Sequence, residues 1–501
     1  MKTLRLRRSA LAIALSSMSL VPSIAPAVDF GKVQETALNL GSQALFGFGL
    51  PVQQASSTSS LAGNGKDAVQ VAKGLSVKVI SNQVGGAGDM IALWPNDENP
   101  THSIVCNEDP NDDLTSPTLK EATVRRVRLA DGFVEDMIFG HVSCDPAHGT
   151  PWGTVIVGEE AGPTGRLWEI LDPLNVNGVV VDHTAGTSTD PLHVQVRAAL
   201  GQLSYEGIVF KNDGAAYYAD ELRPSAGKPG GGLYKFVPAT PYNPASGPIA
   251  SLDQSPLVAG DVYVMRLGLR SNGANYGQGD NTGAGKWIGP LIHSDGNTPA
   301  PLNANLAAIA LAAPFNGYTG YYRPEDMDVD PVAAARGQFR ACWANTGNDT
   351  EQQWGEVMCL TDDATTQTGF NTGSMPVVTP FISGNPKLRM PDNVAFQPKT
   401  GILYVHMDAS TAINNTATAT FTNDDVWACL PDGADSDTLS DGCVRVMTLK
   451  DGTAEFTGGQ FLADGKSFLI HLQHRGDGDP TRGRPFETDE LLVSGLKYPL
   501  P

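Results

Sequence analysis

Acidic side chains beside turns and buried strands are the residues of this sequence best suited to chemistry. They occur in five segments that are far apart along the chain: residues 105–109, 150–160, 203–207, 322–326 and 390–398. Carboxylates gathered from remote strands repel one another unless they bind a cation, and their oxygen atoms suit a hard cation. The sequence therefore predicts one shared cation site built from several parts of the chain.

The N-terminal residues have the pattern of an export signal. Arg5, Arg7 and Arg8 form a basic head, residues 10–21 form an apolar stretch, and residues 25–27 are a small-residue cleavage site. The paired arginines leave both the general secretory route and the twin-arginine route open. No later segment is apolar for long enough to span a bilayer. We expect a signal peptide over residues 1–27 and a periplasmic or secreted product without a membrane span.

The overall composition argues against some partners and favours one fold class. The formal charge is −20, from 34 basic and 54 acidic residues, which argues against a nucleic acid or an anionic membrane as partner. The chain has 55 glycines and 35 prolines but only 18% charged residues, so it is rich in turns and poor in long charged helices. An all-β architecture is expected.

The order of patterns along the chain predicts a β-propeller. Residues 28–68 read as an N-terminal arm and linker, which need not join the core, and short β-branched and aromatic runs follow from residue 69. Residues 391–408 and 458–473 each resemble the inner hairpin of a propeller blade, where acids from different blades can meet at the axis. Blade repeats of about 40–50 residues allow about six blades. We expect a single six-bladed propeller over residues 69–501, with inserted loops and an inserted helix at residues 304–313.

Together these motifs resemble the PhoX-type alkaline phosphatase family, whose members are exported bacterial six-bladed propellers that depend on calcium and iron. The resemblance extends over nearly the whole mature chain. Its most specific pieces are residues 150–154 with Glu159 and Glu160, Glu206 with residues 217–221 and 233–237, residues 323–325, residues 391–393 and residues 461–474.

The resemblance implies a set of metal ligands and one phosphate-binding residue. The implied metal ligands are Glu160, Glu206, Glu325 and Asp392, with Glu108 and Asp220 as calcium ligands and Glu159 as a further candidate. Adjacent residues on a strand point to opposite faces, so only one of Glu159 and Glu160 should reach the same metal. Arg323 is expected to hold the phosphate group of the substrate.

Six cysteines in an exported chain suggest disulfides. Cys342 with Cys359 and Cys429 with Cys443 each flank a short connection and could staple it, although six cysteines allow fifteen connectivities.

The last two cysteines bear on the metal that the resemblance implies. Cys144 matches the cysteine that bridges iron in the family, while Cys106 is additional. We expect these two to form a disulfide within one blade, which removes the sulfur ligand. Calcium is therefore expected, and iron stays an open alternative.

Three functions remain open from the sequence. The first is an exported metal-dependent phosphatase that hydrolyses a small phosphorylated substrate at the carboxylate-bound centre. The second is a calcium-dependent lactonase or esterase, because residues 391–396 also resemble channel motifs of lactonase propellers. The third is a calcium-stabilised binding propeller without catalysis, because a fold and its ligands do not guarantee chemistry. Hydrolysis of p-nitrophenyl phosphate or of a lactone separates the three.

Overall fold

The computed structural model describes most of the 501-residue chain. The described residues are 31–56, 65–108, 121–225, 228–268, 279–362, 375–409, 423–433, 437–452, 454–475 and 487–499. The expected signal peptide at residues 1–27 lies outside them. No helix in these ranges is long and apolar enough to cross a membrane.

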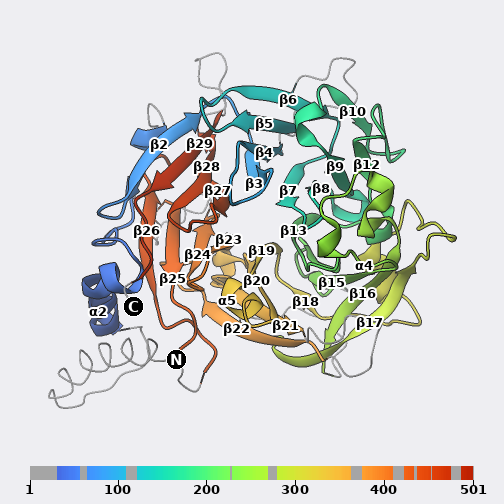
Figure 1. Cartoon of the computed structure of the whole chain (residues 1–501). Coiled ribbons are helices and arrows are strands. Elements are labelled where there is room, and N and C mark those ends of the chain that lie inside the picture. The colour runs from blue at the N-terminus through green and yellow to red at the C-terminus, as the bar shows by residue number, and fades with distance from the viewer. Residues whose placement is uncertain are drawn as a thin grey trace.

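The chain forms an all-β propeller, with β-sheets standing around a central channel (Figure 1). One edge strand of each sheet, and both edge strands of the largest sheet, face this channel. These inner strands are β3 (Gly88–Trp94), β7 (Cys144–Gly149), β13 (Tyr205–Phe210), β19 (Pro324–Val329), β23 (Pro391–Phe396) and β27 (Glu455–Phe461). Short polar or glycine-containing turns join some successive strands, such as those at residues 397–402 and 462–466, as expected for antiparallel meanders.

From the channel outward, each sheet continues by antiparallel pairing, apart from the parallel pair β6–β10. The first sheet is β3, β4 (His102–Asn107), β5 (Val124–Arg128), β6 (Val134–Phe139), β10 (Val179–Asp182) and β11 (Thr187–Ser188). The second is β7, β8 (Thr154–Glu159), β9 (Leu167–Leu171) and β12 (Val194–Val196).

The largest sheet has ten strands and begins and ends at the channel. Its order is β13, β14 (Ala216–Asp220), β15 (Gly231–Pro238), β16 (Gly260–Leu267), β17 (Gly283–His293), β22 (Val377–Ser383), β21 (Glu356–Asp362), β20 (Phe339–Asn345) and β19, with β18 (Gly320–Tyr321) beside β15. Only two residue pairs join β17 to β22, at the outer rim.

The ring is closed by strands from the beginning of the described chain. β1 (Val69–Val71) pairs with β26 (Cys443–Leu449), followed inward by β25 (Asp425–Cys429), β24 (Leu403–Met407) and β23. β2 (Ser76–Ser81) pairs with β29 (Glu487–Ser494), followed by β28 (Ser467–Arg475) and β27. Early and late parts of the chain thus hold each other in place around the channel.

Helices are few among the described residues, and the longest of them lies outside the ring of strands (Figure 1). α2 (Gly31–Leu45) packs against β26, and Leu38 and Phe46 are buried in the same core cluster as the closing sheets, so the N-terminal arm joins the core. The helix expected at residues 304–313 is α4 (Leu306–Leu311), where the Asn305 side chain accepts a hydrogen bond from the backbone N–H of Ala308. The other short helices are α3 (Gly65–Ala68), α5 (Pro331–Ala334) and the 3₁₀ turns Gly162–Thr164, Pro173–Asn175, Ala198–Leu200, Pro244–Ser246, Leu252–Gln254, Pro256–Val258 and Asp349–Glu351.

All six cysteines form disulfides, with the pairing expected from the sequence: Cys106–Cys144, Cys342–Cys359 and Cys429–Cys443. The last two join directly paired residues on neighbouring strands. The first differs from the expectation in one respect, because Cys106 on β4 and Cys144 on β7 belong to different sheets. This bond links two neighbouring sheets beside the channel and does not lie within one blade.

Candidate metal centre

Each inner strand carries an acidic residue at its first or second position. In chain order these residues are Asp89, Asp145, Glu206, Glu325, Asp392 and Glu455. The strand ladder shifts register immediately after most of them, for example between Tyr205 and Ile208 on β13 and between Pro324 and Met327 on β19. Such bulges redirect a side chain from the regular alternation of a strand. Sequence-remote acids are thereby turned toward the same end of the channel.

Close approach of two inner strands brings Glu206 and Glu325 together. A Cβ atom on Gly207 would lie only 2.7 Å from the carbonyl oxygen of Glu325 and 2.6 Å from the backbone nitrogen of Met327. Only glycine allows this contact between β13 and β19, because any side chain would push the strands apart. Gly207 therefore helps to set the spacing of the acidic residues that precede it and face it.

Three groups of acids among the described residues are compact enough to hold a cation. They are Asp89, Glu108 and Asp145; Glu206, Glu325 and Asp392; and Asp392, Asp408 and Glu455. Within each group, one ligand atom from every residue lies within 4.8 Å of the others. Calcium binds oxygen at about 2.3–2.6 Å, so one ion can contact oxygens separated by that distance. Asp392 belongs to two groups and links them.

The electrostatics of these groups favour a bound cation. Burial raises the pKa of Glu206, Glu325 and Asp392 well above the usual range of a carboxyl, and the charges of neighbouring acids raise it further. One carboxylate oxygen of Asp89 and one of Asp145 are buried without a hydrogen-bond partner. Without a cation, such groups must either take up protons or repel one another. The donors of the three groups are all oxygen atoms, which fits calcium.

Two further predicted ligands, Glu108 and Glu160, lie side by side at the same end of the channel. Glu108 is in the first group, and burial followed by repulsion from Asp89 raises its pKa to about 8. Glu160 is outside the three groups, but burial and then the charge of Glu108 raise its pKa to about 9.

Glu159 points away from this end of the channel. Its carboxylate lies 2.8 Å from Nδ1 of His183 and accepts hydrogen bonds from the backbone N–H groups of Arg166 and Val142, at 2.9 and 3.2 Å. Alternation along the strand thus separates the carboxylate of Glu159 from that of Glu160.

Asp220 on β14 also lies outside the three groups. It accepts a hydrogen bond from the backbone N–H of Ser204 at 3.0 Å, and burial raises its pKa to about 8. The structure therefore does not bring Glu159 and Asp220 into a common group with the other predicted ligands.

Arg323 is surrounded by carboxylates at the same end of the channel. Its Nε donates to Oε1 of Glu221, its Nη2 lies 3.2 Å from Oε1 of Glu325, and its Nη1 lies 3.9 Å from Oδ2 of Asp408. The backbone of Arg323 has a φ of 55°, a left-handed conformation that few non-glycine residues adopt. A residue keeps such a conformation only where the surrounding structure fixes it. Here the conformation places the guanidinium beside Glu325 of the second acidic group and Asp408 of the third.

Comparisons with known proteins identify the family of this chain. The family model for alkaline phosphatase PhoX matches residues 114–476. The chain belongs to this family. PhoX from Pseudomonas fluorescens, solved in complex with vanadate, a transition state analogue, has a TM-score of 0.59 and 15% identity and covers 89% of this chain and 99% of its own. At that identity the likeness shows the shared fold.

Other solved propellers align less well, and no curated protein matches this sequence. A gluconolactonase from Xanthomonas campestris has a TM-score of 0.39 and 12% identity and covers 89% of this chain and 99% of its own. A calcium-binding regucalcin from Agrobacterium tumefaciens has a TM-score of 0.36 and 11% identity, with coverage of 85% and 97%.

The cysteine that the PhoX resemblance assigns to iron is not available as a ligand in this structure. Cys144 is bonded to Cys106, and both residues are fully buried. A disulfide sulfur is not a thiolate and does not bind iron as one. The residues present therefore fit a centre with oxygen ligands and do not fit one bridged by this cysteine.

Four residues of the three groups were missed in the sequence: Asp89, Asp145, Asp408 and Glu455. Asp145 was hard to find because β7 has the sequence Cys-Asp-Pro-Ala-His-Gly, without the apolar run that marks a strand. Asp408 and Glu455 stand at the edges of segments already interpreted as inner hairpins. The signal that could have found Asp89, Asp145 and Glu455 is positional, namely one acid at the start of every inner strand. Asp408 follows β24 and has no such signal.

Proposed function

We propose that this chain is an exported phosphatase that hydrolyses small phosphate esters at a calcium centre at the acidic end of the channel. The observation that carries the proposal is a guanidinium next to a compact group of acids: Nη2 of Arg323 lies 3.2 Å from Oε1 of Glu325, which is grouped with Glu206 and Asp392. A cation held by the acids and a guanidinium beside it form two adjacent positive charges, which suits a phosphate dianion.

Calcium would be held by the three groups, with Asp392 shared between two of them and with Glu160 close to Glu108. Bound there, it would neutralise charge on the phosphate group and polarise its phosphorus–oxygen bonds. Iron is not part of the proposal, because Cys144, the cysteine that the family resemblance assigns to iron, is held in a disulfide.

Arg323 would hold the phosphate. Glu221 and Asp408 orient the guanidinium from the protein side, and Glu325 lies between it and the acids of its group. When a cation offsets the charge of Glu325, the remaining N–H groups of Arg323 are free to donate to two phosphate oxygens at once. Such a paired contact fixes the orientation of the phosphate as well as its position.

The proposal includes a domain plan. The ten-stranded sheet carries an inner strand at each end, so we propose that it comprises two blades joined at their outer edges and that the propeller has six blades over residues 69–501. Residues 28–68 would be an N-terminal arm docked on the last blades, and residues 1–27 an export signal. Export to the periplasm or beyond agrees with the three disulfides.

Hydrolysis of p-nitrophenyl phosphate by the purified mature chain tests the proposal, measured after chelation and again after calcium is restored. We expect activity that chelation abolishes and calcium restores. Glu325→Gln should lose both the activity and part of the bound calcium, while Glu351→Gln, at an exposed site on a 3₁₀ turn, should keep both. Bound calcium without phosphatase activity would instead favour a binding propeller, and hydrolysis of a lactone alone would favour a lactonase.

A further inference from the structure

The opposite end of the channel contains a cavity of about 800 Å³ that the proposed phosphatase centre does not use. Its lining comes from the later residues of the inner strands, such as Leu93 on β3, Asp328 on β19 and Phe396 on β23, and from the turns after them. Each residue of a strand advances by about 3.3 Å, so Asp328 lies about 10 Å further along β19 than Glu325. The cavity and the acidic groups are therefore separate sites on the same strands.

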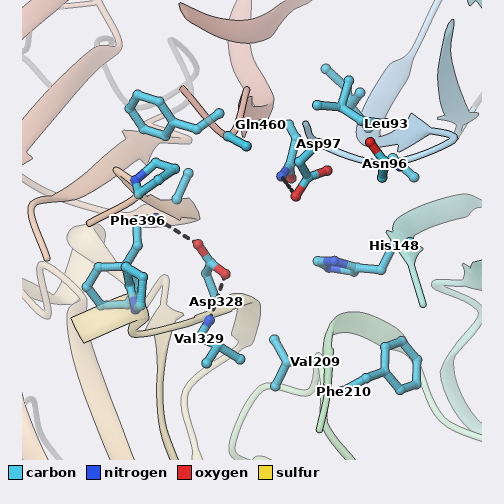
Figure 2. A pocket seen from close by; sticks show the side chains of 18 of the residues that line it. Leu93, Asn96, Asp97, His148, Val209, Phe210, Asp328, Val329, Phe396 and Gln460 are labelled. Atoms are coloured by element: carbon cyan, nitrogen blue, oxygen red, sulfur yellow. Dashed lines mark hydrogen bonds between the residues drawn. The ribbon is translucent and has the colours of Figure 1, made fainter. Parts of the chain in front are cut away.

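The cavity combines apolar walls with two polar side chains that face each other. Figure 2 shows His148 and Asp328 pointing toward one another across the space, with Val209, Phe210 and Phe396 around them. Nε2 of His148 has no hydrogen-bond partner and lies 3.8 Å from Oδ1 of Asp326. Apolar walls with a few convergent polar groups are the usual composition of a small-molecule site.

Asp328 is held in place but lacks a cationic partner. Its carboxylate accepts hydrogen bonds from the backbone N–H groups of Phe396 and Val329, at 2.7 and 2.6 Å. Among the described residues, no lysine or arginine forms an ion pair with it, and burial raises its pKa to about 7. A half-buried carboxylate without a lysine or arginine partner is stabilised when a cation binds beside it.

The charges that line the cavity also favour a cationic ligand. Four acids line it, Asp97, Glu98, Asp326 and Asp328, against two basic residues, Arg336 and Lys399. Arg336 and Lys399 are exposed, as are Asp97 and Glu98, and Nζ of Lys399 lies over the ring of Tyr498, 5.7 Å from its centre; Asp326 and Asp328 are the less exposed acids. The interior of the cavity is thus left with acidic and aromatic surfaces, which attract organic cations.

We propose that this cavity is a second ligand site, which binds a small organic cation consisting of an amine on an apolar or aromatic body, with Asp328 as the counter-ion. The amine would lie between Asp328 and His148, and the apolar body would pack on Val209, Phe210 and Phe396. This site is independent of phosphate-ester hydrolysis and of the cations at the other end of the channel.

Calorimetric titration with 2-phenylethylamine tests the proposal. The mature chain is kept in excess calcium, so that the acidic end of the channel is occupied and does not compete for the amine. We expect saturable binding of one amine per chain, about tenfold tighter than binding of 2-phenylethanol, which has nearly the same shape without the charge. Equal affinities for the amine and the alcohol, or no saturable binding of the amine, would overturn the proposal.

Two neighbouring alanines provide a matched pair of variants. Ala335 lines the cavity and Ala334 does not, and both side chains are exposed, so a tryptophan at either position leaves the core intact. Ala335→Trp should abolish amine binding and Ala334→Trp should preserve it.

Asp328→Asn should weaken binding of the amine by about tenfold and leave binding of the alcohol unchanged. Equal binding by the two tryptophan variants, or unchanged amine binding in Asp328→Asn, would show that the amine binds elsewhere.

Discussion

The two ends of the channel are made by the same inner strands but differ in chemistry. At the start of β19, Glu325 lies in a group of buried acids beside Arg323, and the ladder to β20 is irregular there. Three residues later, Asp328 faces an apolar cavity, and regular pairing has resumed. The comparison teaches that register shifts and close strand approach, as at Gly207, gather the compact acidic groups at one end, while at the other end, where pairing is regular, Asp328 lies among apolar walls.

Loss of the acid shared by two groups should have the largest effect on the acidic end. Asp392→Ala removes a ligand from both groups to which Asp392 belongs. We expect less bound calcium per chain by elemental analysis and a fall of at least about 1000-fold in phosphatase activity, because the charges that hold the phosphate are lost together. Asp328→Ala, at the other end of the channel, is the control. A comparable loss of calcium in Asp328→Ala would contradict the separation of the two ends.

Two arginines, one at each end, sharpen the comparison further. Arg323→Ala should lower kcat by about 100-fold or more, because the guanidinium is proposed to hold the charge that develops on the phosphate. Calcium content should stay unchanged, since Arg323 is not a ligand. Arg336→Ala, at the rim of the cavity, should retain wild-type kcat. Equal turnover of Arg323→Ala and wild type would remove Arg323 from the proposed function.

When calcium is removed by a chelator, the stability of the fold should depend on pH. This dependence should be weaker when calcium is bound. In the metal-free fold the pKa of Glu108 is about 8 and that of Glu160 about 9, against 4.5 for the unperturbed group. Between these values the folded state binds more protons than the unfolded state, so the free energy of unfolding falls as pH rises from about 4.5 to about 9. We expect the melting temperature of the chelated protein to fall between pH 6 and pH 9.

Added calcium should restore most of the melting temperature that the chelated protein loses between pH 6 and pH 9. At a free concentration 100 times its Kd, one bound ion stabilises the fold by about 2.7 kcal/mol. The melting temperature in calcium should therefore exceed that of the chelated protein, and the difference should be larger at pH 9 than at pH 6. Melting temperatures that are independent of both calcium and pH would contradict a cation site at the acidic end.

The convergence of several acidic residues could be predicted from the sequence. Other features could not, because they depend on which strands pair over long distances along the chain. Glu206, Glu325 and Asp392 stand beside clear turn and strand signals, so their convergence was expected. Asp145 was missed because β7 has few strand-forming residues and is fixed by its neighbours. The sequence also does not show that β4 and β7 belong to different sheets. The Cys106–Cys144 bond was therefore expected within one blade. Strand pairing over long distances decides such features.

The smallest expected effect concerns that disulfide, which joins two sheets at the acidic end. Cys106 lies two residues before Glu108, and Cys144 directly precedes Asp145, so the bond fixes the backbone on which two acids of the first group stand. Replacing both cysteines by serine should weaken calcium binding by about tenfold, comparable to loss of a residue that supports metal ligands. The pair Cys429 and Cys443, within one sheet, is the matched control. Its replacement by serine should lower the melting temperature and leave calcium affinity unchanged. Equal calcium affinities in the two double variants would show that the bond between the sheets stabilises the fold without ordering the first group of acids.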